Sequence, residues 1–206
     1  MAQPLAENGQ SPMKAIWPID DTAVWRAALE EYADVVAALG VSRLVVLDDW
    51  YQFDFPDMLK SRSPKFVTLD ELIKVTEWKM KRGVYRAHNL QLIKGNPAED
   101  VKQRSEKAFS LIPDPRKPIA ELAALAGVGP ATASAVLAAA RPDLYPFFDE
   151  IVANQIPGLG PVAFTIPYYI KYAERLRERA KQLGKTFTPH AVAQALFSAA
   201  GGKAGV

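Results

Sequence analysis

Hydrophobic residues that recur every three or four positions run through most of this chain and predict a protein built from helices. The clearest case begins at Thr68. Glu71, three residues later, completes a capping box, and apolar residues follow at helical spacing. We therefore predict a helix over residues 69–82 that ends at Gly83.

Similar patterns, bounded by Asp, Gly or Pro, predict the other helices, the first of them capped by Asp20 or Asp21. They cover residues 21–39, 98–111, 119–125, 131–140, 150–155, 166–183 and 189–200. Residues 44–47 suit a strand or a buried helical turn equally, and little strand signal follows residue 48. The chain is therefore predicted to be all-α, a helical bundle of roughly seven to ten helices with short connections.

A chain of 206 residues is long enough for one domain, over residues 16–200, or for two lobes of one domain. Residues 1–15 are polar with Gly and Pro, and residues 201–206 are Gly-rich, so both ends are expected to be disordered.

The composition narrows the possible chemistry. The chain has no cysteine, which excludes disulfides, zinc–thiolate sites and cysteine-ligated iron–sulfur clusters. No run of apolar residues approaches a membrane span, and the first residues lack the order of a signal peptide. We expect a soluble intracellular monomer, with the nucleus among its locations and no bound metal. The net charge of +2 neither requires nor forbids nucleic acid, because local patches matter more than totals.

One short turn stands out. Gly127-Val128-Gly129-Pro130 joins two apolar helices, and Pro130 suits the first position of the second helix, where a missing N–H costs nothing. Both glycines can adopt positive φ and admit a close backbone, while Val128 can insert between the helices. The free N–H groups at the start of the second helix, with the helix dipole behind them, form an anion site typical of phosphate binding.

This turn resembles a helix-hairpin-helix motif, whose usual ligand is a nucleic-acid backbone phosphate. Eighteen positions beyond Ala131 lies Asp149, in a loop that contains Pro146. The combination is similar to the helix-hairpin-helix (HhH-GPD) DNA glycosylases, in which such a loop ends in the catalytic Asp. The resemblance covers residues 94–162. It implies an all-α glycosylase-like fold, double-stranded DNA as the partner, and DNA contacts at Gly127, Val128, Gly129, Ala131 and Thr132.

The resemblance also implies a reaction. Asp149 would stabilise the cationic sugar that forms as the N-glycosidic bond breaks, and would take a proton from the attacking water. Family members that are also lyases carry a Lys where this chain has Ala131, so a monofunctional enzyme without a Schiff base is expected. The chain departs from the family at Phe148, Glu150 and Asn154. Asp149 is equally a good helix N-cap, and the two roles are compatible.

Two other segments are candidates for binding. The end of the 69–82 helix and the residues after it are basic, and we assign Lys79, Arg82 and Arg86 to DNA contacts; the alternative is that they only complement the helix dipole. His88 is assigned to the polar surface or to a phosphate contact. The aromatic residues Trp50, Tyr51, Phe53 and Trp78 are assigned to a base-binding pocket, because flipped bases stack between aromatic side chains. The alternative for residues 48–55, which we expect to form a loop, is a hydrophobic plug with surface acids.

Two functions therefore compete. The first is a monofunctional DNA glycosylase that excises a damaged or modified base. The second is a non-catalytic DNA-binding module with a second hairpin at Gly158-Leu159-Gly160; a hairpin kept only for protein contacts is a third. No cofactor is expected, although backbone carbonyls of the hairpin could bind one monovalent cation. The position of Asp149 discriminates, because a glycosylase needs it in a cleft that faces the hairpin.

Overall fold

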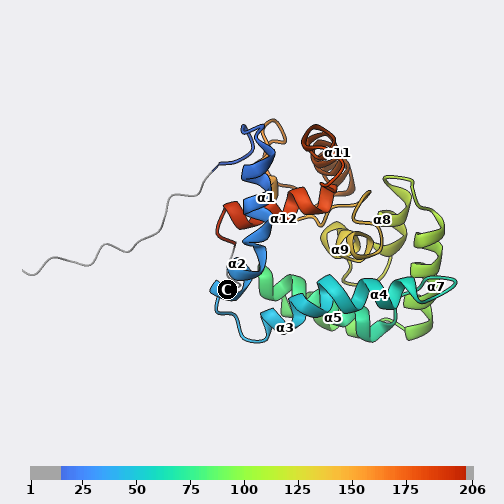
Figure 1. Cartoon of the computed structure of the whole chain (residues 1–206). Helices are drawn as coiled ribbons and strands as arrows, with labels where there is room; N and C mark the ends of the chain where they lie inside the picture. The colour runs from blue at the N-terminus through green and yellow to red at the C-terminus, as the bar shows by residue number, and fades with distance from the viewer. Residues whose placement is uncertain (1–14, 203–206) are drawn as a thin grey trace, which may run out of the picture.

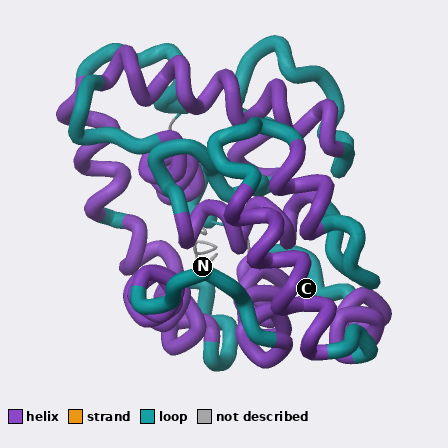
Figure 2. Tube along the Cα trace, turned by 90° about the vertical axis from the view of Figure 1, so that its right-hand side faces the viewer, coloured by secondary structure: helices purple, strands orange, loops and turns teal. Residues whose placement is uncertain are grey.

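The computed structural model describes residues 15–202, and within that range the chain consists of helices and loops with no strand (Figure 2). The prediction of an all-α protein is confirmed. The disorder expected before residue 15 and after residue 202 lies outside the described residues. No helix in residues 15–202 has the length and apolar character needed to cross a membrane.

The first predicted helix is divided into two. The carboxylate of Asp21 accepts a hydrogen bond from Ala23 N at 2.9 Å and caps α1 (Thr22–Glu30). α2 (Tyr32–Ala38) follows after a break at Glu31. The prediction was right about the helical state and about the cap, and it missed the break.

The expectation of a loop at residues 48–55 is wrong. α3 (Leu44–Asp49), a π-helical turn (Trp50–Asp54) and α4 (Phe55–Lys60) follow one another without interruption. The buried residues of this stretch recur every three or four positions: Leu44, Leu47, Tyr51, Phe55 and Leu59. The aromatic residues therefore continue a helical stripe that packs into the core. The local density of acids concealed that stripe.

α5 (Leu69–Arg82) matches its prediction. Thr68 Oγ1 accepts from Glu71 N at 3.2 Å, and the Glu71 carboxylate accepts from Thr68 N at 2.8 Å, which is the predicted capping box. α6 (Ala87–Lys94) was not predicted, because it is short and no side chain caps its first turn.

The remaining helices lie close to their predicted bounds. They are α7 (Ala98–Ser110), α8 (Lys117–Leu122), α9 (Pro130–Ala140), α10 (Glu150–Ala153), α11 (Ile166–Leu183) and α12 (Pro189–Ala199). α9 lies in the middle of the molecule and contacts α4, α5 and α8 (Figure 1). It is buried on almost every side, and its many alanines let these neighbours approach closely.

The two ends of the described chain meet. α12 packs against α1 and α11, so the last helix closes the bundle over the first (Figure 1). Gly201 N donates to Ser198 O, and Gly202 N donates to Phe197 O. These first two residues of the predicted flexible tail are therefore hydrogen-bonded to the end of α12.

The two glycine turns differ. α9 begins at Pro130, directly after Gly129, whereas α11 begins only at Ile166, several residues beyond Gly160. The second turn therefore lacks a helix start that would present free N–H groups, and it does not repeat the geometry of the first.

Gly127 and Gly129 also differ from each other. Gly127 has φ of +75°, and a Cβ built on it would lie 2.6 Å from the carbonyl oxygen of Asn89 in α6. Gly129 has φ of −99°, and a Cβ there would meet nothing within 4 Å. Close approach of a second backbone therefore depends on Gly127 alone.

We predict that Gly127→Ala lowers the free energy of unfolding by at least about 2 kcal/mol, through left-handed strain and a clash with α6. Gly129→Ala should cost less than about 1 kcal/mol, because an extended N-cap position tolerates a methyl group in open space. Chemical denaturation of both variants checks this. Equal losses would show that α6 does not constrain the turn.

Candidate functional site

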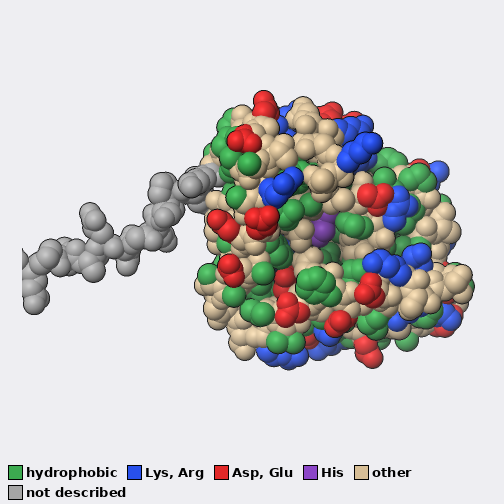
Figure 3. Space-filling model, viewed as in Figure 1, with side chains coloured by type: hydrophobic (Ala, Val, Ile, Leu, Met, Phe, Trp, Pro, Cys, Tyr) green, Lys and Arg blue, Asp and Glu red, His purple; other side chains and the backbone are tan. Residues whose placement is uncertain are grey.

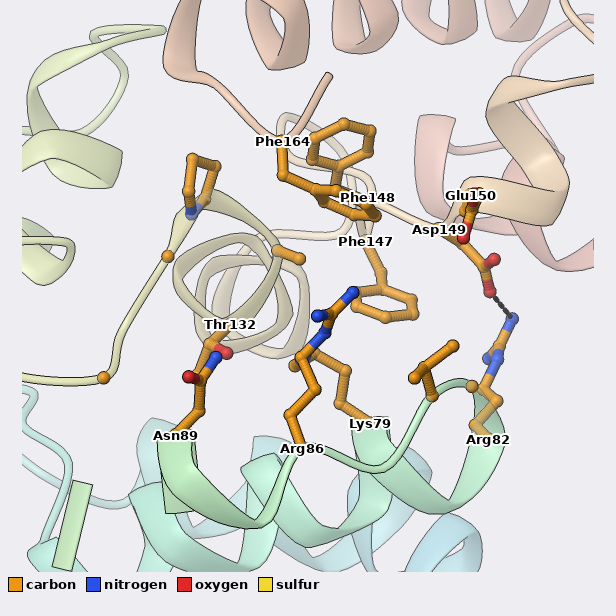
Figure 4. Close-up of a pocket in the computed structure, with 16 residues that line it drawn as sticks. Lys79, Arg82, Arg86, Asn89, Thr132, Phe147, Phe148, Asp149, Glu150 and Phe164 are labelled. Carbon is orange, nitrogen blue, oxygen red and sulfur yellow. Dashed lines mark ion pairs between the residues drawn. The ribbon is translucent and has the colours of Figure 1, made fainter. Parts of the chain in front are cut away.

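A pocket of about 340 Å³ lies between the start of α9, the end of α5 and the loop before α10 (Figure 4). Its lining comprises Lys79, Arg82, Gly83, Val84, Arg86, Asn89, Gly127, Gly129, Pro130, Ala131, Thr132, Phe147, Phe148, Asp149, Glu150 and Phe164. The structure thus brings most of the predicted DNA contacts and Asp149 into one cavity.

The turn at one wall of the pocket is held by an amide side chain that sequence reasoning missed. Asn96 Nδ2 donates to the carbonyl of Ala126 at 2.9 Å, and Ala126 N donates to Asn96 Oδ1 at 2.9 Å. Val128 is buried in the core, as its expected insertion between the helices requires, and it does not line the pocket, which corrects its assignment to a DNA contact. The carbonyl of Ala126 is therefore already engaged, which leaves one fewer oxygen for the cation considered for this turn. No three His, Cys, Asp or Glu side chains of residues 15–202 lie together as a metal site would need.

The start of α9 faces the pocket. Gly129 is its N-cap, no side chain caps this end, and Pro130 occupies the first turn. The N–H groups of the first turn therefore lack the side-chain acceptor that most helices provide, and the helix dipole favours an anion in front of them. Thr132 and Ala131 are buried, so they can meet a ligand chiefly through their backbone.

The loop that leads to Asp149 is fixed by hydrogen bonds to its backbone. Four side chains supply them: Ser134 Oγ accepts from Phe148 N at 2.9 Å, His190 Nδ1 accepts from Phe147 N at 3.3 Å, Tyr172 Oη donates to Phe147 O at 2.7 Å and Tyr169 Oη donates to Pro146 O at 3.3 Å. These partners come from α9, α11 and α12. Three helices therefore determine where Asp149 lies.

Asp149 is both a helix cap and a wall of the pocket. One carboxylate oxygen accepts a hydrogen bond from Ile151 N at 2.9 Å and so caps α10. The other oxygen lies 3.2 Å from a guanidinium nitrogen of Arg82 (Figure 4). The Asp149 side chain is 13% exposed, so it remains accessible from the cavity.

Arg82 is the central cation of the site. Its side chain is only 3% exposed, and its guanidinium donates to the hydroxyl of Tyr32 at 2.6 Å and lies 3.7 Å above the ring of Phe197. Burial by itself would lower the pKa of Arg82, but Tyr32, Asp149 and Asp48 raise it above its ordinary value. The burial corrects the assignment of Arg82 to a DNA phosphate contact: this side chain holds Asp149 instead.

Lys79 and Arg86 point into the cavity from the same side (Figure 4). Within the described residues neither side chain forms a hydrogen bond or an ion pair, and Arg86 is exposed. Burial and the neighbouring Arg86 charge lower the pKa of Lys79 to about 8, and Asp149 opposes that shift. At neutral pH both side chains are therefore charged and unpaired in the pocket.

The predicted aromatic pocket is wrong. Trp50, Tyr51 and Trp78 are buried in the core, where Tyr51 and Trp78 stack with ring centroids 3.6 Å apart. Phe53 is 67% exposed, and none of the four lines the cavity. The alternative of a hydrophobic plug at residues 48–55 fits Trp50 and Tyr51, because their rings are buried in the core.

Phe147, Phe148 and Phe164 form the aromatic wall instead. Phe148, which sequence reasoning treated as a departure from the family, packs against Phe164 and Tyr168 rather than filling the cavity. Its position next to Asp149 in the sequence was the signal that could have identified this wall. Nothing in the local sequence marked Ser134, His190 or Asn96, whose roles depend on partners far along the chain.

Outside the pocket, the surface shows no uniform basic patch on the face seen in Figure 3, where acidic and basic side chains are intermixed. His88 is exposed, as expected of a polar surface residue. Comparison of the chain with protein-family models, curated proteins and solved structures finds no match. A function for this chain must therefore be inferred from the site itself.

His190 generates a pH prediction. Burial and Arg82 lower its pKa from 6.5 to about 3, so the folded protein holds it neutral while the unfolded chain protonates it below pH 6.5. Stability should therefore fall as the pH drops below 6.5, by about 2 kcal/mol on reaching pH 5. Urea unfolding at several pH values measures this loss.

His190→Gln should flatten the pH dependence between pH 6.5 and 5, whatever its stability at pH 7, since glutamine does not titrate. His88→Gln, at the exposed histidine, is the matched control and should keep the parent's slope. If His190→Gln also kept that slope, another group would be responsible for it.

Proposed function

We propose that this protein is a monofunctional DNA N-glycosylase that acts as a monomer on double-stranded DNA and excises a damaged or modified base. The observation that supports this most strongly is the shared cavity of Asp149 and the 127–132 turn. The Asp149 side chain is 13% exposed and lines the same cavity as the turn. A glycosylase needs its carboxylate in such a cleft, and a purely structural cap does not.

In the proposed reaction a backbone phosphate binds at the start of α9, and the target nucleotide enters the cavity beside the phenylalanine wall. The C1′–N bond breaks and its electron pair leaves with the base, while Asp149 stabilises the cationic sugar. Water bonds to C1′ through its oxygen, and the proton it loses passes through Asp149 and ends on the base. No cofactor is required for this balance.

The ion pair with Arg82 is compatible with that role. Each carboxylate oxygen has two lone pairs, so an oxygen that already accepts one hydrogen bond can accept another from water. Arg82 and the N–H of Ile151 fix the orientation of the carboxylate. The cost is that the Arg82 charge offsets part of the negative field at the sugar.

The tandem-hairpin alternative receives less support. It requires a second anion site at residues 158–160, and no helix begins there. It also leaves unexplained why a carboxylate and two unpaired cations share a cavity with the first turn.

We predict that Asp149→Asn lowers the excision rate by about a hundred- to a thousandfold, since loss of such an electrostatic group costs about 3–4 kcal/mol in the transition state. Asn keeps the N-cap but leaves the buried Arg82 charge without its partner, so the variant should also be less stable. Abasic-site formation on a panel of lesion-bearing duplexes is measured at a temperature where circular dichroism shows the variant to be folded. An Asp149→Asn variant that excises at the parent's rate would remove Asp149 from the mechanism.

The same panel tests the monofunctional mechanism. Borohydride should trap no covalent protein–DNA adduct, because Ala131 stands where a lyase would have its amine. Lys79 contributes the amine nearest to this chemistry in the pocket lining, so an adduct that disappears in Lys79→Gln would replace the water mechanism with an amine mechanism.

The turn gives a separate prediction about DNA binding. Gly129→Glu adds a negative charge at the start of α9 in open space, so the variant should fold but bind duplex DNA about tenfold more weakly. The slope of log K against log salt should also fall by about one for each phosphate that the variant no longer binds.

Ala37→Glu, on the exposed side of α2, adds the same charge away from the pocket and is the matched control. Equal affinities of the two variants would show that the turn does not bind DNA, and the proposed function would lose its binding site.

A further inference from the structure

The charged side chains that the pocket leaves unpaired are hydrogen-bond donors. The ammonium of Lys79 and the guanidinium of Arg86 have no acceptor among the described residues, and neither group can accept a hydrogen bond. Both carboxylates of the lining already interact within the protein: Asp149 with Arg82 and Ile151 N, and Glu150 with a partner of its own. The charged groups that remain for a ligand are therefore donors, beside the Asn89 amide, which offers both an acceptor and a donor.

The two cations also enter the cavity from the same side (Figure 4). Because the Arg86 charge contributes to the lowered pKa of Lys79, the two charges repel each other within the cavity. A ligand with acceptor atoms relieves this repulsion and supplies both missing hydrogen bonds. A ligand with a positive charge of its own increases the repulsion, and an amino group would place donor against donor.

The charge that develops during base release also favours a base without a positive charge. An uncharged base leaves with the electron pair of the C1′–N bond, so negative charge accumulates on it, and nearby cations stabilise that charge. A base that carries a positive charge before excision leaves neutral and gains nothing from Lys79 or Arg86. The cations therefore favour the release of uncharged bases.

Resting on the proposed function, we propose that the pocket selects deaminated bases, in which a carbonyl has replaced an amino group, and that Lys79 and Arg86 read that carbonyl edge. Uracil and hypoxanthine belong to this class. Cytosine and adenine, with their amino groups, and N-alkylated purines, with their positive charge, are rejected. In hypoxanthine the adjacent acceptors O6 and N7 can pair with a guanidinium together, which gives Arg86 the larger share of the discrimination against adenine; with uracil each cation pairs with one carbonyl.

The test compares single-turnover excision from duplexes that carry uracil, hypoxanthine, 7-methylguanine or no lesion at one position. Uracil or hypoxanthine should be released at least about tenfold faster than 7-methylguanine. Lys79→Gln and Arg86→Gln should each reduce that ratio by about tenfold or more, because glutamine also offers an acceptor. Affinity of each variant for a duplex with an abasic-site analogue is measured alongside, because removing either cation also weakens attraction to the backbone, whereas the ratio compares two bases in the same variant and so reports the base edge alone.

Lys81→Gln is the matched control. Lys81 lies in α5, as Lys79 does, but its amine donates to the carbonyl of Ser42 outside the pocket. Removing this amine should leave the ratio of the two excision rates unchanged. Because Arg86 is exposed, Arg86→Gln should fold even if Lys79→Gln does not.

The outcomes separate the two proposals. Release of 7-methylguanine as fast as uracil, or Gln variants that behave like Lys81→Gln, would overturn the base assignment and leave the glycosylase in place. If no duplex loses a base and none with a lesion is bound more tightly than undamaged DNA, the glycosylase proposal fails and the base assignment fails with it.

Discussion

The buried guanidinium of Arg82 is the interaction on which the site depends. A buried cation is tolerated only when nearby groups compensate its charge, and those groups come from distant parts of the chain: Tyr32 in α2, Asp149 before α10 and the ring of Phe197 in α12. Asp48, held by Tyr32 and Trp78, adds a second negative charge to the network. Correct packing of α2, α5 and α12 around Arg82 therefore also orients the carboxylate of Asp149.

The second constraint is the anchored loop before Asp149. A loop of Pro and Phe has few polar side chains with which to fix itself, so its backbone groups are paired by Ser134, Tyr172 and His190 from other helices. Buried backbone groups left without such partners would cost free energy, so the loop has one favoured path. Functional groups held in this way lose little entropy when a ligand binds.

The sequence predicted what is encoded locally. The N-terminal starts of α5 and α12 follow from Thr68 and Thr188, each of which caps its helix with its own side chain. α9 begins at Pro130 as expected. Joining Asp149 to the turn in one cavity followed from a resemblance over residues 94–162, not from periodicity. What could not be predicted are the tertiary contacts between residues far apart in the chain. A basic residue at the end of α5 suggests solvent, and only the fold shows that Arg82 is buried.

The aromatic residues also show that burial cannot be predicted from the local sequence. Trp50 and Tyr51 attracted a functional interpretation because large rings gather near acids, yet large rings bury the most apolar area and are usually drawn into the core. The rings that line the cavity are Phe147 and Phe148, directly before Asp149, and Phe164, in the connection before α11. Proximity in sequence to a fixed carboxylate was a better guide than aromatic density.

The charge of the pocket explains why the overall composition carried so little information. A net charge of +2 spread over 206 residues is nearly neutral, and acidic and basic side chains are intermixed on the face in Figure 3. Inside the cavity the balance differs, because the lining carries three cations, Lys79, Arg82 and Arg86, against two carboxylates, Asp149 and Glu150. The field there is positive, and low-dielectric walls weaken it less than water would. In the proposed reaction this field attracts a phosphate and the departing anionic base to the cavity in which the carboxylate is fixed.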